Sequence, residues 1–159
     1  MAEAAGRAPG VFDETFLIGI EGVTEVLLIR HGQVDYDPDA TVGDLADPPL
    51  TQQGRQQARL LAEALSTIRL AAVFTSPMRR AMETAEAMLH HHRHLQLEVI
   101  PDLREVEVFR DAPPDKTLRE FLGTELLGAL RHRMLTERNW DVYPHSEPSY
   151  DFRKRCINA

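Results

Sequence analysis

Three short apolar runs are spaced along the first two thirds of the chain. Residues 26–29 are four consecutive branched apolar residues, a pattern typical of a strand that is buried on both faces. Residues 70–75 and 95–100 form two similar runs, and Pro101 ends the last one. The hydrophobic pattern therefore predicts three strands.

Amphipathic segments separate these runs. Apolar residues recur at helical spacing over 52–66, directly after Thr51 as a candidate N-cap. A second helical pattern runs to about His90 and begins at Ser76-Pro77, which resembles an N-cap followed by proline at the first helical position. The order strand, helix, strand, helix, strand favours a parallel sheet with right-handed crossovers.

The remaining segments are more irregular. Residues 33–49 are rich in Asp and Pro and show no periodicity, which predicts a long loop of the kind that is often functional. Residues 116–138 predict a long helix that is broken at Gly123 or Gly128. Residues 150–159 resemble the opening turns of another helix, and no C-cap follows. We therefore expect the sequence to be a fragment.

Length and composition narrow the class of protein. The chain has 159 residues, which favours one domain, and we expect this domain to span 23–159 after an extension over 1–22. A formal net charge of −7 argues against a nucleic-acid partner, since phosphate contacts need clustered Lys and Arg. The apolar runs are too short for a membrane span. The single Cys156 excludes an internal disulfide framework and fits a reducing cytoplasm.

Ionisable residues follow each of the three predicted strands. Arg30 and His31 come after the first strand, Arg80 lies in the helix after the second, and Glu105 follows the third. Because ligands bind at the carboxyl edge of parallel strands, we expect these side chains to converge. Arginine binds phosphate oxygens bidentately, histidine can attack phosphorus, and a carboxylic acid can protonate a leaving oxygen. The set suits phosphoryl transfer.

Four sequence motifs in the same order resemble one family. Leu28-Ile29-Arg30-His31-Gly32 is similar to the signature of the histidine phosphatase superfamily, which includes phosphoglycerate mutases. Residues 49–58 are similar to its "PLTxxGxxQA" segment, residues 76–85 to its "SPxxRAxxTA" segment, and 103–105 to the "LxE" that follows. The resemblance implies an α/β fold of three layers, α/β/α, with a mostly parallel, phosphoglycerate mutase-like sheet whose C-terminal part is missing here.

The resemblance also implies roles for residues. His31 would be the nucleophile that becomes phosphohistidine, and Glu105 would be the general acid. Arg30 and Arg80 would bind the phosphoryl oxygens, and Arg80 rather than Arg79 occupies the family's arginine position. Gln33 and His145 would contact substrate. Neither a metal nor a cofactor is implied.

The sequence departs from the family pattern at several places. The family's second histidine is absent, and because 149–155 resembles the segment just upstream of it, we expect that histidine beyond Ala159. Val106 to Arg110 stands where a Gly-rich acidic stretch is common, which leaves Glu107 as a rival to Glu105. The mutase features are missing from 33–50, which favours a phosphatase.

These observations leave three functions open. The first is a cytoplasmic phosphohydrolase that cleaves a small phosphomonoester, and the second is mutase-type phosphoryl transfer. The third is a catalytically inactive module that binds a phospholigand or a partner protein. If a sheet edge is left open, a homodimer contact would cover it.

His90 and His94 have the spacing of helical zinc ligands, but their place at a helix C-terminus favours a dipole contact.

Overall fold

The computed structural model describes residues 24–37 and 39–159, so the expected extension over 1–22 lies outside the described residues. The chain divides into two compact units, 1–30 and 31–159. Within the first unit, residues 24–30 form neither helix nor strand, and Leu28 is 94% exposed. The prediction of a buried strand over 26–29 is therefore wrong. A strand needs a hydrogen-bonded neighbour, and the ladder of the described residues joins only two other segments.

Two parallel strands form the sheet of the second unit. β1 (Val73–Thr75) pairs with β2 (Leu97–Val99), and Val73 stands opposite Leu97. Both strands are shorter than the predicted runs, but their parallel pairing confirms the strand–helix–strand order. The fold of this unit is therefore α/β, as predicted.

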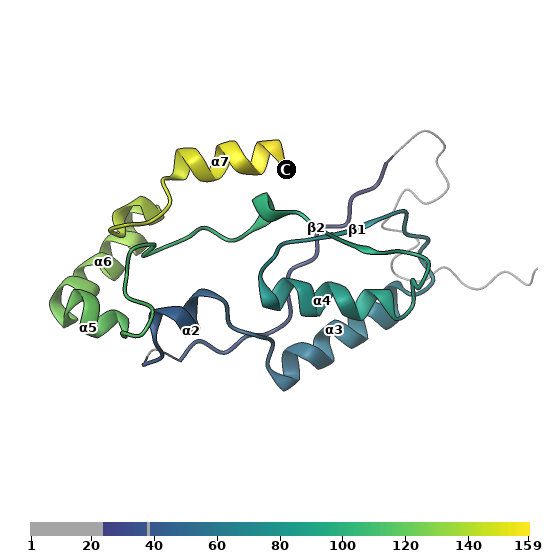
Figure 1. Ribbon diagram of the computed structural model, residues 1–159, viewed down its shortest axis with the longest axis horizontal. Helices are drawn as coiled ribbons and strands as arrows, with labels where there is room; N and C mark the ends of the chain where they lie inside the picture. Colours follow the sequence, from purple (N-terminus) through teal and green to yellow (C-terminus); the bar gives the residue numbers. More distant parts are fainter. Residues whose placement is uncertain (1–23, 38) are drawn as a thin grey trace, which may run out of the picture. The chain divides into compact units, whose positions relative to one another are not determined.

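Helix α3 (Gln52–Leu65) agrees with its prediction. The Thr51 hydroxyl caps it by accepting the backbone N–H of Gly54 at 3.0 Å. One residue in each turn is buried, namely Gly54, Ala58, Ala62 and Leu65. This face packs along α4 (Arg79–Leu89), and the two helices lie side by side in Figure 1. Ala62, Leu65 and Met88 form the apolar core between them.

The start of α4 differs from the prediction. Ser76 does not cap it, because the helix begins two residues later, after Met78. Its first N–H, that of Arg79, donates to the Asp47 carboxylate at 2.8 Å. A side chain from a distant loop therefore supplies the acceptor that the sequence pattern assigned to a neighbouring serine.

The predicted loop over 33–49 contains one helical turn. α2 (Val42–Ala46) is capped by Thr41, whose hydroxyl accepts the N–H of Asp44. Isolated bridges join Val34 to Leu50 and Thr41 to Thr117, so both parts of the loop are fixed by backbone pairing.

Helices continue beyond the sheet. The 3-10 turn η1 (Pro101–Leu103) follows β2, and the predicted long helix is split into α5 (Leu118–Leu122) and α6 (Thr124–Glu137). The break lies at Gly123, whose φ of 77° is a left-handed conformation that glycine adopts readily. η2 (Trp140–Val142) and α7 (Ser149–Asn158) complete the order. In the described part of the chain, no helix is long and apolar enough to cross a membrane.

Candidate functional site

The backbone beside His31 is fixed to helix α4. The Gly32 N–H donates to the Thr84 hydroxyl at 3.1 Å, and that hydroxyl donates to the carbonyl of Arg80 at 2.7 Å. Thr84 and Arg80 are one helical turn apart, so the residue that follows His31 is anchored one turn from the arginine. The structure thus links two of the predicted site segments through one buried threonine.

Helix α3 supports the same backbone from another direction. A Cβ atom built on Gly32 would lie 2.5 Å from the carbonyl oxygen of Gly54, and one on Gly54 would lie 2.1 Å from that of Gln33. Neither distance leaves room for a methyl group. The glycines of the Arg-His-Gly and Leu-Thr-x-x-Gly motifs are therefore needed for a close contact between two backbone segments.

The imidazole of His31 has a defined orientation. Its Nδ1 lies 2.7 Å from the carbonyl oxygen of Gly32. A carbonyl only accepts hydrogen bonds, so Nδ1 carries the proton in this contact. Nε2 then keeps its lone pair and is the atom that can act as a nucleophile.

Arg80 is a buried cation between two carboxylates. It is 4% exposed, and its guanidinium lies 3.8 Å from Asp47 and 3.9 Å from Glu105. Both distances are too long for a hydrogen bond. Within the part of the chain that the structure describes, Nη1 of Arg80 is buried and has no hydrogen-bond partner. A buried charged donor without a partner is costly, so this nitrogen is suited to an anion.

Glu105 and Glu107 are held differently. Glu105 is exposed and directs Oε2 toward Arg80, while its Oε1 accepts the N–H of Val106 at 3.0 Å. Glu107 instead pairs with Arg110 at 2.8 Å and with Arg104 at 3.3 Å. Of the two carboxylates, Glu105 is therefore the one that faces Arg80 on α4.

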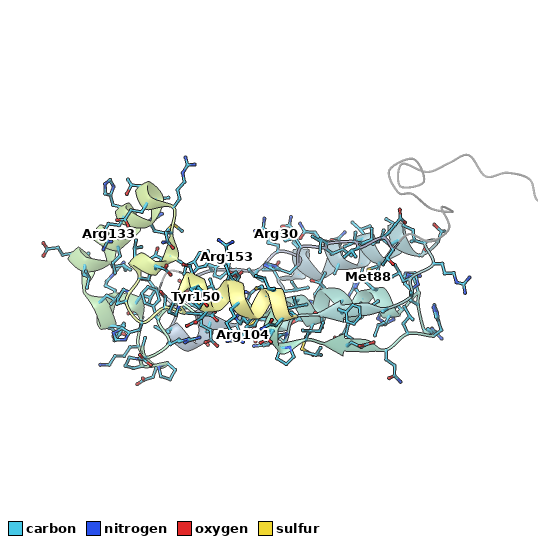
Figure 2. All side chains as sticks on the ribbon, turned by 90° about the horizontal axis from the view of Figure 1, so that it is seen from above. Arg30, Met88, Arg104, Arg133, Tyr150 and Arg153 are labelled. Carbon is cyan, nitrogen blue, oxygen red and sulfur yellow. The ribbon has the colours of Figure 1, made fainter. Side chains whose placement is uncertain are left out.

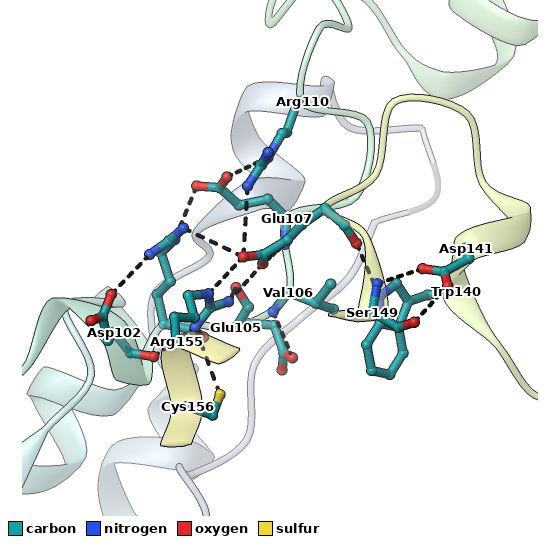
Figure 3. A network of polar contacts seen from close by, with 12 residues as sticks. Asp102, Glu105, Val106, Glu107, Arg110, Trp140, Asp141, Ser149, Arg155 and Cys156 are labelled. Carbon is teal, nitrogen blue, oxygen red and sulfur yellow. Dashed lines mark hydrogen bonds and ion pairs between the residues drawn. The ribbon is translucent and has the colours of Figure 1, made fainter. Parts of the chain in front are cut away.

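A buried ion pair between Arg155 and Glu147 contacts the segment that carries Glu105 (Figure 3). Arg155 on α7 donates Nε and Nη2 to the two carboxylate oxygens of Glu147, each at 2.7 Å. Its Nη1 donates to the carbonyls of Asp102 and Arg104, and its Nη2 also donates to that of Glu105. The hydrogen bonds from Arg155 hold the pKa of the Glu147 carboxyl below its usual value, although burial acts in the opposite direction.

The other predicted residues lie in other surroundings. The side chain of Gln33 accepts a hydrogen bond from the Thr51 hydroxyl at 2.9 Å, at the start of α3. His145 has a φ of 61° and contacts Asp111 at 3.0 Å, in the segment before α7. Arg30 is exposed and belongs to the first unit. The structure thus brings together Arg80 and Glu105. Thr84, one helical turn along α4 from Arg80, binds the backbone of Gly32, the residue that follows His31.

Three residues were missed by the sequence prediction. Asp47, Thr84 and Glu147 each bind a predicted site segment, and none was assigned a role. Thr84 lies in the quoted "SPxxRAxxTA" match, so its position within a motif was an available signal. Asp47 is one of several aspartates in the loop, and nothing in the sequence distinguishes it from the others.

No metal site is apparent among residues 24–37 and 39–159, since they contain no group of three or more His, Cys, Asp or Glu side chains placed to hold an ion. A hollow of about 390 Å³ between α3 and α4 is lined by residues such as Arg55, Glu83 and His90. Its lining does not include Arg80 or Glu105, so this hollow and the candidate site are different places.

Comparison with known families and structures gives consistent results. The sequence pattern of the histidine phosphatase superfamily (branch 1) matches residues 26–159. Phosphoserine phosphatase 1 of Hydrogenobacter thermophilus is 34% identical over 90 residues, which are 54% of this chain and 39% of that protein.

Solved structures show the same likeness. A mycobacterial glucosyl-3-phosphoglycerate phosphatase is 28% identical with a TM-score of 0.57, over 79% of this chain and 56% of that one. The alpha-ribazole phosphatase of Shigella flexneri has a TM-score of 0.60 at 24% identity, over 82% of this chain and 62% of that one. The chain thus spans about half the length of these relatives.

Proposed function

Because the chain belongs to the histidine phosphatase superfamily, we propose that it is a phosphohydrolase that cleaves a small phosphomonoester through a phosphohistidine at His31. The observation that carries the proposal is Arg80, a buried guanidinium whose Nη1 lies 3.8 Å from Asp47 and has no hydrogen-bond partner among the described residues. A phosphoryl oxygen would accept the hydrogen bond that this nitrogen can donate. Two similar proteins are named as phosphatases of small phosphorylated molecules, which supports the same class of substrate.

In the first half of the proposed reaction, His31 is phosphorylated and the alcohol leaves. Nε2 of His31 attacks phosphorus, because the proton of this imidazole is on Nδ1, against the Gly32 carbonyl. The bond from phosphorus to the ester oxygen breaks. Glu105, in its acid form, gives its proton to that oxygen, and an alcohol leaves. Arg80 stabilises the charge on the phosphoryl oxygens, and the motif alone suggests the same role for Arg30.

The second half returns the enzyme to its starting state. The Glu105 carboxylate takes a proton from water, whose oxygen attacks phosphorus. The phosphorus–nitrogen bond breaks, inorganic phosphate leaves, and His31 is neutral again. Gln33 and His145 are proposed as substrate contacts beyond the phosphate. A cytoplasmic location and a homodimer remain part of the proposal.

A phosphoenzyme experiment tests the proposal. Incubation with a labelled phosphomonoester and rapid quenching should trap label that is stable in alkali and lost in acid, as expected for phosphohistidine. His31→Ala should trap none while its circular dichroism stays unchanged. His91→Ala, which replaces an exposed histidine after α4, is the matched control and should label normally. Wild-type labelling of the His31→Ala variant would contradict the assignment.

The unpartnered nitrogen of Arg80 also favours a second candidate, a module that binds a phospholigand without turnover. Saturable binding of inorganic phosphate with no phosphoenzyme and no hydrolysis of any tested ester would support this function instead.

Mutase-type transfer is distinguished by its acceptor. A mutase moves the phosphoryl group to a second substrate hydroxyl, whereas a phosphohydrolase releases inorganic phosphate to water.

A further inference from the structure

The segment that carries Glu105 has little regular structure of its own. η1 ends at Leu103, and residues 104–108 form neither helix nor strand. Its carbonyl groups therefore need partners from outside the segment. A general acid must be held within hydrogen-bond reach of the leaving oxygen, so something other than local secondary structure has to place this carboxyl.

Arg155 supplies these partners. Its Nη1 donates to the carbonyls of Asp102 at 2.6 Å and Arg104 at 2.8 Å, and its Nη2 donates to the carbonyl of Glu105 at 3.1 Å. One guanidinium from α7 thus bonds three carbonyls within four consecutive residues. Figure 3 shows it reaching across from α7 to this segment. The planar fork of arginine suits this task, and lysine could not reproduce it.

Glu147 fixes the orientation of that guanidinium. It is 1% exposed and receives two hydrogen bonds of 2.7 Å from Arg155. Its own backbone N–H donates to the Glu107 carbonyl at 2.7 Å, on the other side of Glu105. Arg104 and Arg110 also lie 3.6 Å from the same carboxylate. The pair therefore binds the backbone on both sides of Glu105.

We propose that the buried Glu147–Arg155 pair is a positioning device for Glu105, which holds the proton-donating carboxyl in front of the phosphoryl site. This inference rests on the proposed function, in which Glu105 is the general acid. Arg155 and Glu147 touch neither the substrate nor the reacting atoms. They act through the carbonyls of residues 102–105 and through the pairing of residues 107 and 147.

The leaving group of the substrate separates positioning from simple loss of structure. An aryl phosphate with an acidic phenol needs little help from a proton donor, whereas an alkyl phosphate needs a great deal. Arg155→Met should lower kcat/KM, which reports the step that forms the phosphohistidine and releases the alcohol, about 10–100-fold for an alkyl phosphate, a part of the roughly 10²–10⁴-fold that general acid–base catalysis contributes. For p-nitrophenyl phosphate the loss of kcat/KM should be much smaller, whereas the later hydrolysis of the phosphohistidine, which also uses Glu105, is common to both substrates.

A matched control comes from the same helix. Arg153→Met removes an exposed arginine of α7 two residues away and should leave both rates unchanged (Figure 2). Equal losses on the two substrates after Arg155→Met would overturn the inference and leave the proposed function standing. Wild-type labelling of the His31→Ala variant would instead defeat the proposed function.

Hydrogen exchange provides a readout that needs no activity. The N–H groups of Val106 and Glu107 donate to the carboxylates of Glu105 and Glu147. Arg155→Met should speed exchange at these two amides, while amides of α3 keep their wild-type protection. Unchanged exchange at residues 106 and 107 would overturn the inference, even in a variant without turnover. If Arg155→Met does not fold, Glu147→Asp, which keeps the charge but shortens the arm, replaces it in both measurements.

Discussion

The guanidinium of Arg80 is buried beside two carboxylates, and among the described residues its Nη1, 3.8 Å from Asp47, has no hydrogen-bond partner. Arg80→Met should weaken binding of inorganic phosphate about 10–100-fold, since a hydrogen bond to a charged group contributes roughly 1.5–3 kcal/mol. Calorimetric titration with phosphate measures the effect. Arg79→Met is the matched control, because that side chain is exposed, and it should leave the affinity unchanged. Equal losses in both variants would show that only net charge matters.

The site residues show what sequence alone can and cannot assign. Glu105 and Glu107 have the same residue type two positions apart, and the motif favoured Glu105 without any geometry. The structure separates them, because Arg110 and Arg104 hold Glu107 while Glu105 faces Arg80. Asp47 could not have been identified, since its role depends on a contact with an amide 32 positions away along the chain.

Helix α3 approaches the Gly32–Gln33 backbone so closely that Gly54 has no room for a side chain. Gly54→Ala should lower the free energy of unfolding by about 1–3 kcal/mol, because an added methyl group in a filled space forces the backbone apart. Gly128→Ala in α6 is the matched control. Nothing lies within 4 Å of its Cβ position, so this change should stabilise by up to about 1 kcal/mol through helix propensity. Chemical denaturation distinguishes the two signs, and a stabilising Gly54→Ala would contradict the close contact.

Helix α4 depends on an acceptor that arrives from the loop over 33–49. Asp47→Ala leaves the Arg79 N–H without that acceptor and should cost about 0.5–2 kcal/mol of stability, as the loss of an N-cap does. Asp35→Ala, an exposed aspartate of the same loop, should cost much less. Thermal unfolding of the two variants gives the comparison. Similar melting temperatures would mean that Asp47 does not support the helix.

The elements themselves were largely readable from the sequence. Helix α3 begins where periodicity and the Thr51 cap placed it, and α7 begins one residue before the predicted start at Tyr150. The long helix breaks at Gly123, one of the two glycines that the sequence offered. The failures involve long-range partners. Residues 26–29 have strand composition but no neighbouring strand in the described structure, and α4 starts where Asp47 caps it rather than at Ser76.

The buried Glu147–Arg155 pair links the stability of the whole molecule to pH. Hydrogen bonds from Arg155 lower the pKa of Glu147, so folding favours the carboxylate. The stabilisation is complete above the ordinary glutamate pKa of about 4.3 and is lost as the pH falls through the lowered native value. Acid should therefore destabilise the wild type below about pH 4, and Glu147→Gln should flatten that part of the profile while lowering stability near neutral pH.

Urea denaturation at a series of pH values measures this dependence. Glu137→Gln is the control, because Glu137 forms an exposed ion pair with Arg133 on α6, where Figure 2 labels Arg133. This substitution should leave the loss of stability at low pH unchanged. If Glu147→Gln loses stability at low pH as steeply as the wild type, other carboxylates control acid unfolding. If that variant does not fold, the carboxyl chemical shift of Glu147 in the wild type reports its titration directly.

The bonds of Arg155 to the carbonyls of Asp102 and Glu105 span 53 and 50 positions of the chain. This distance has a consequence for biosynthesis. The ribosome synthesises His31, Arg80 and the helices α3 and α4 well before it adds Arg155. Under the proposed function, the nascent chain therefore contains the phosphate-binding Arg80 before it contains the helix that fixes the segment of Glu105. If the proposal is correct, a nascent chain without α7 should bind phosphate before it is able to hydrolyse an ester.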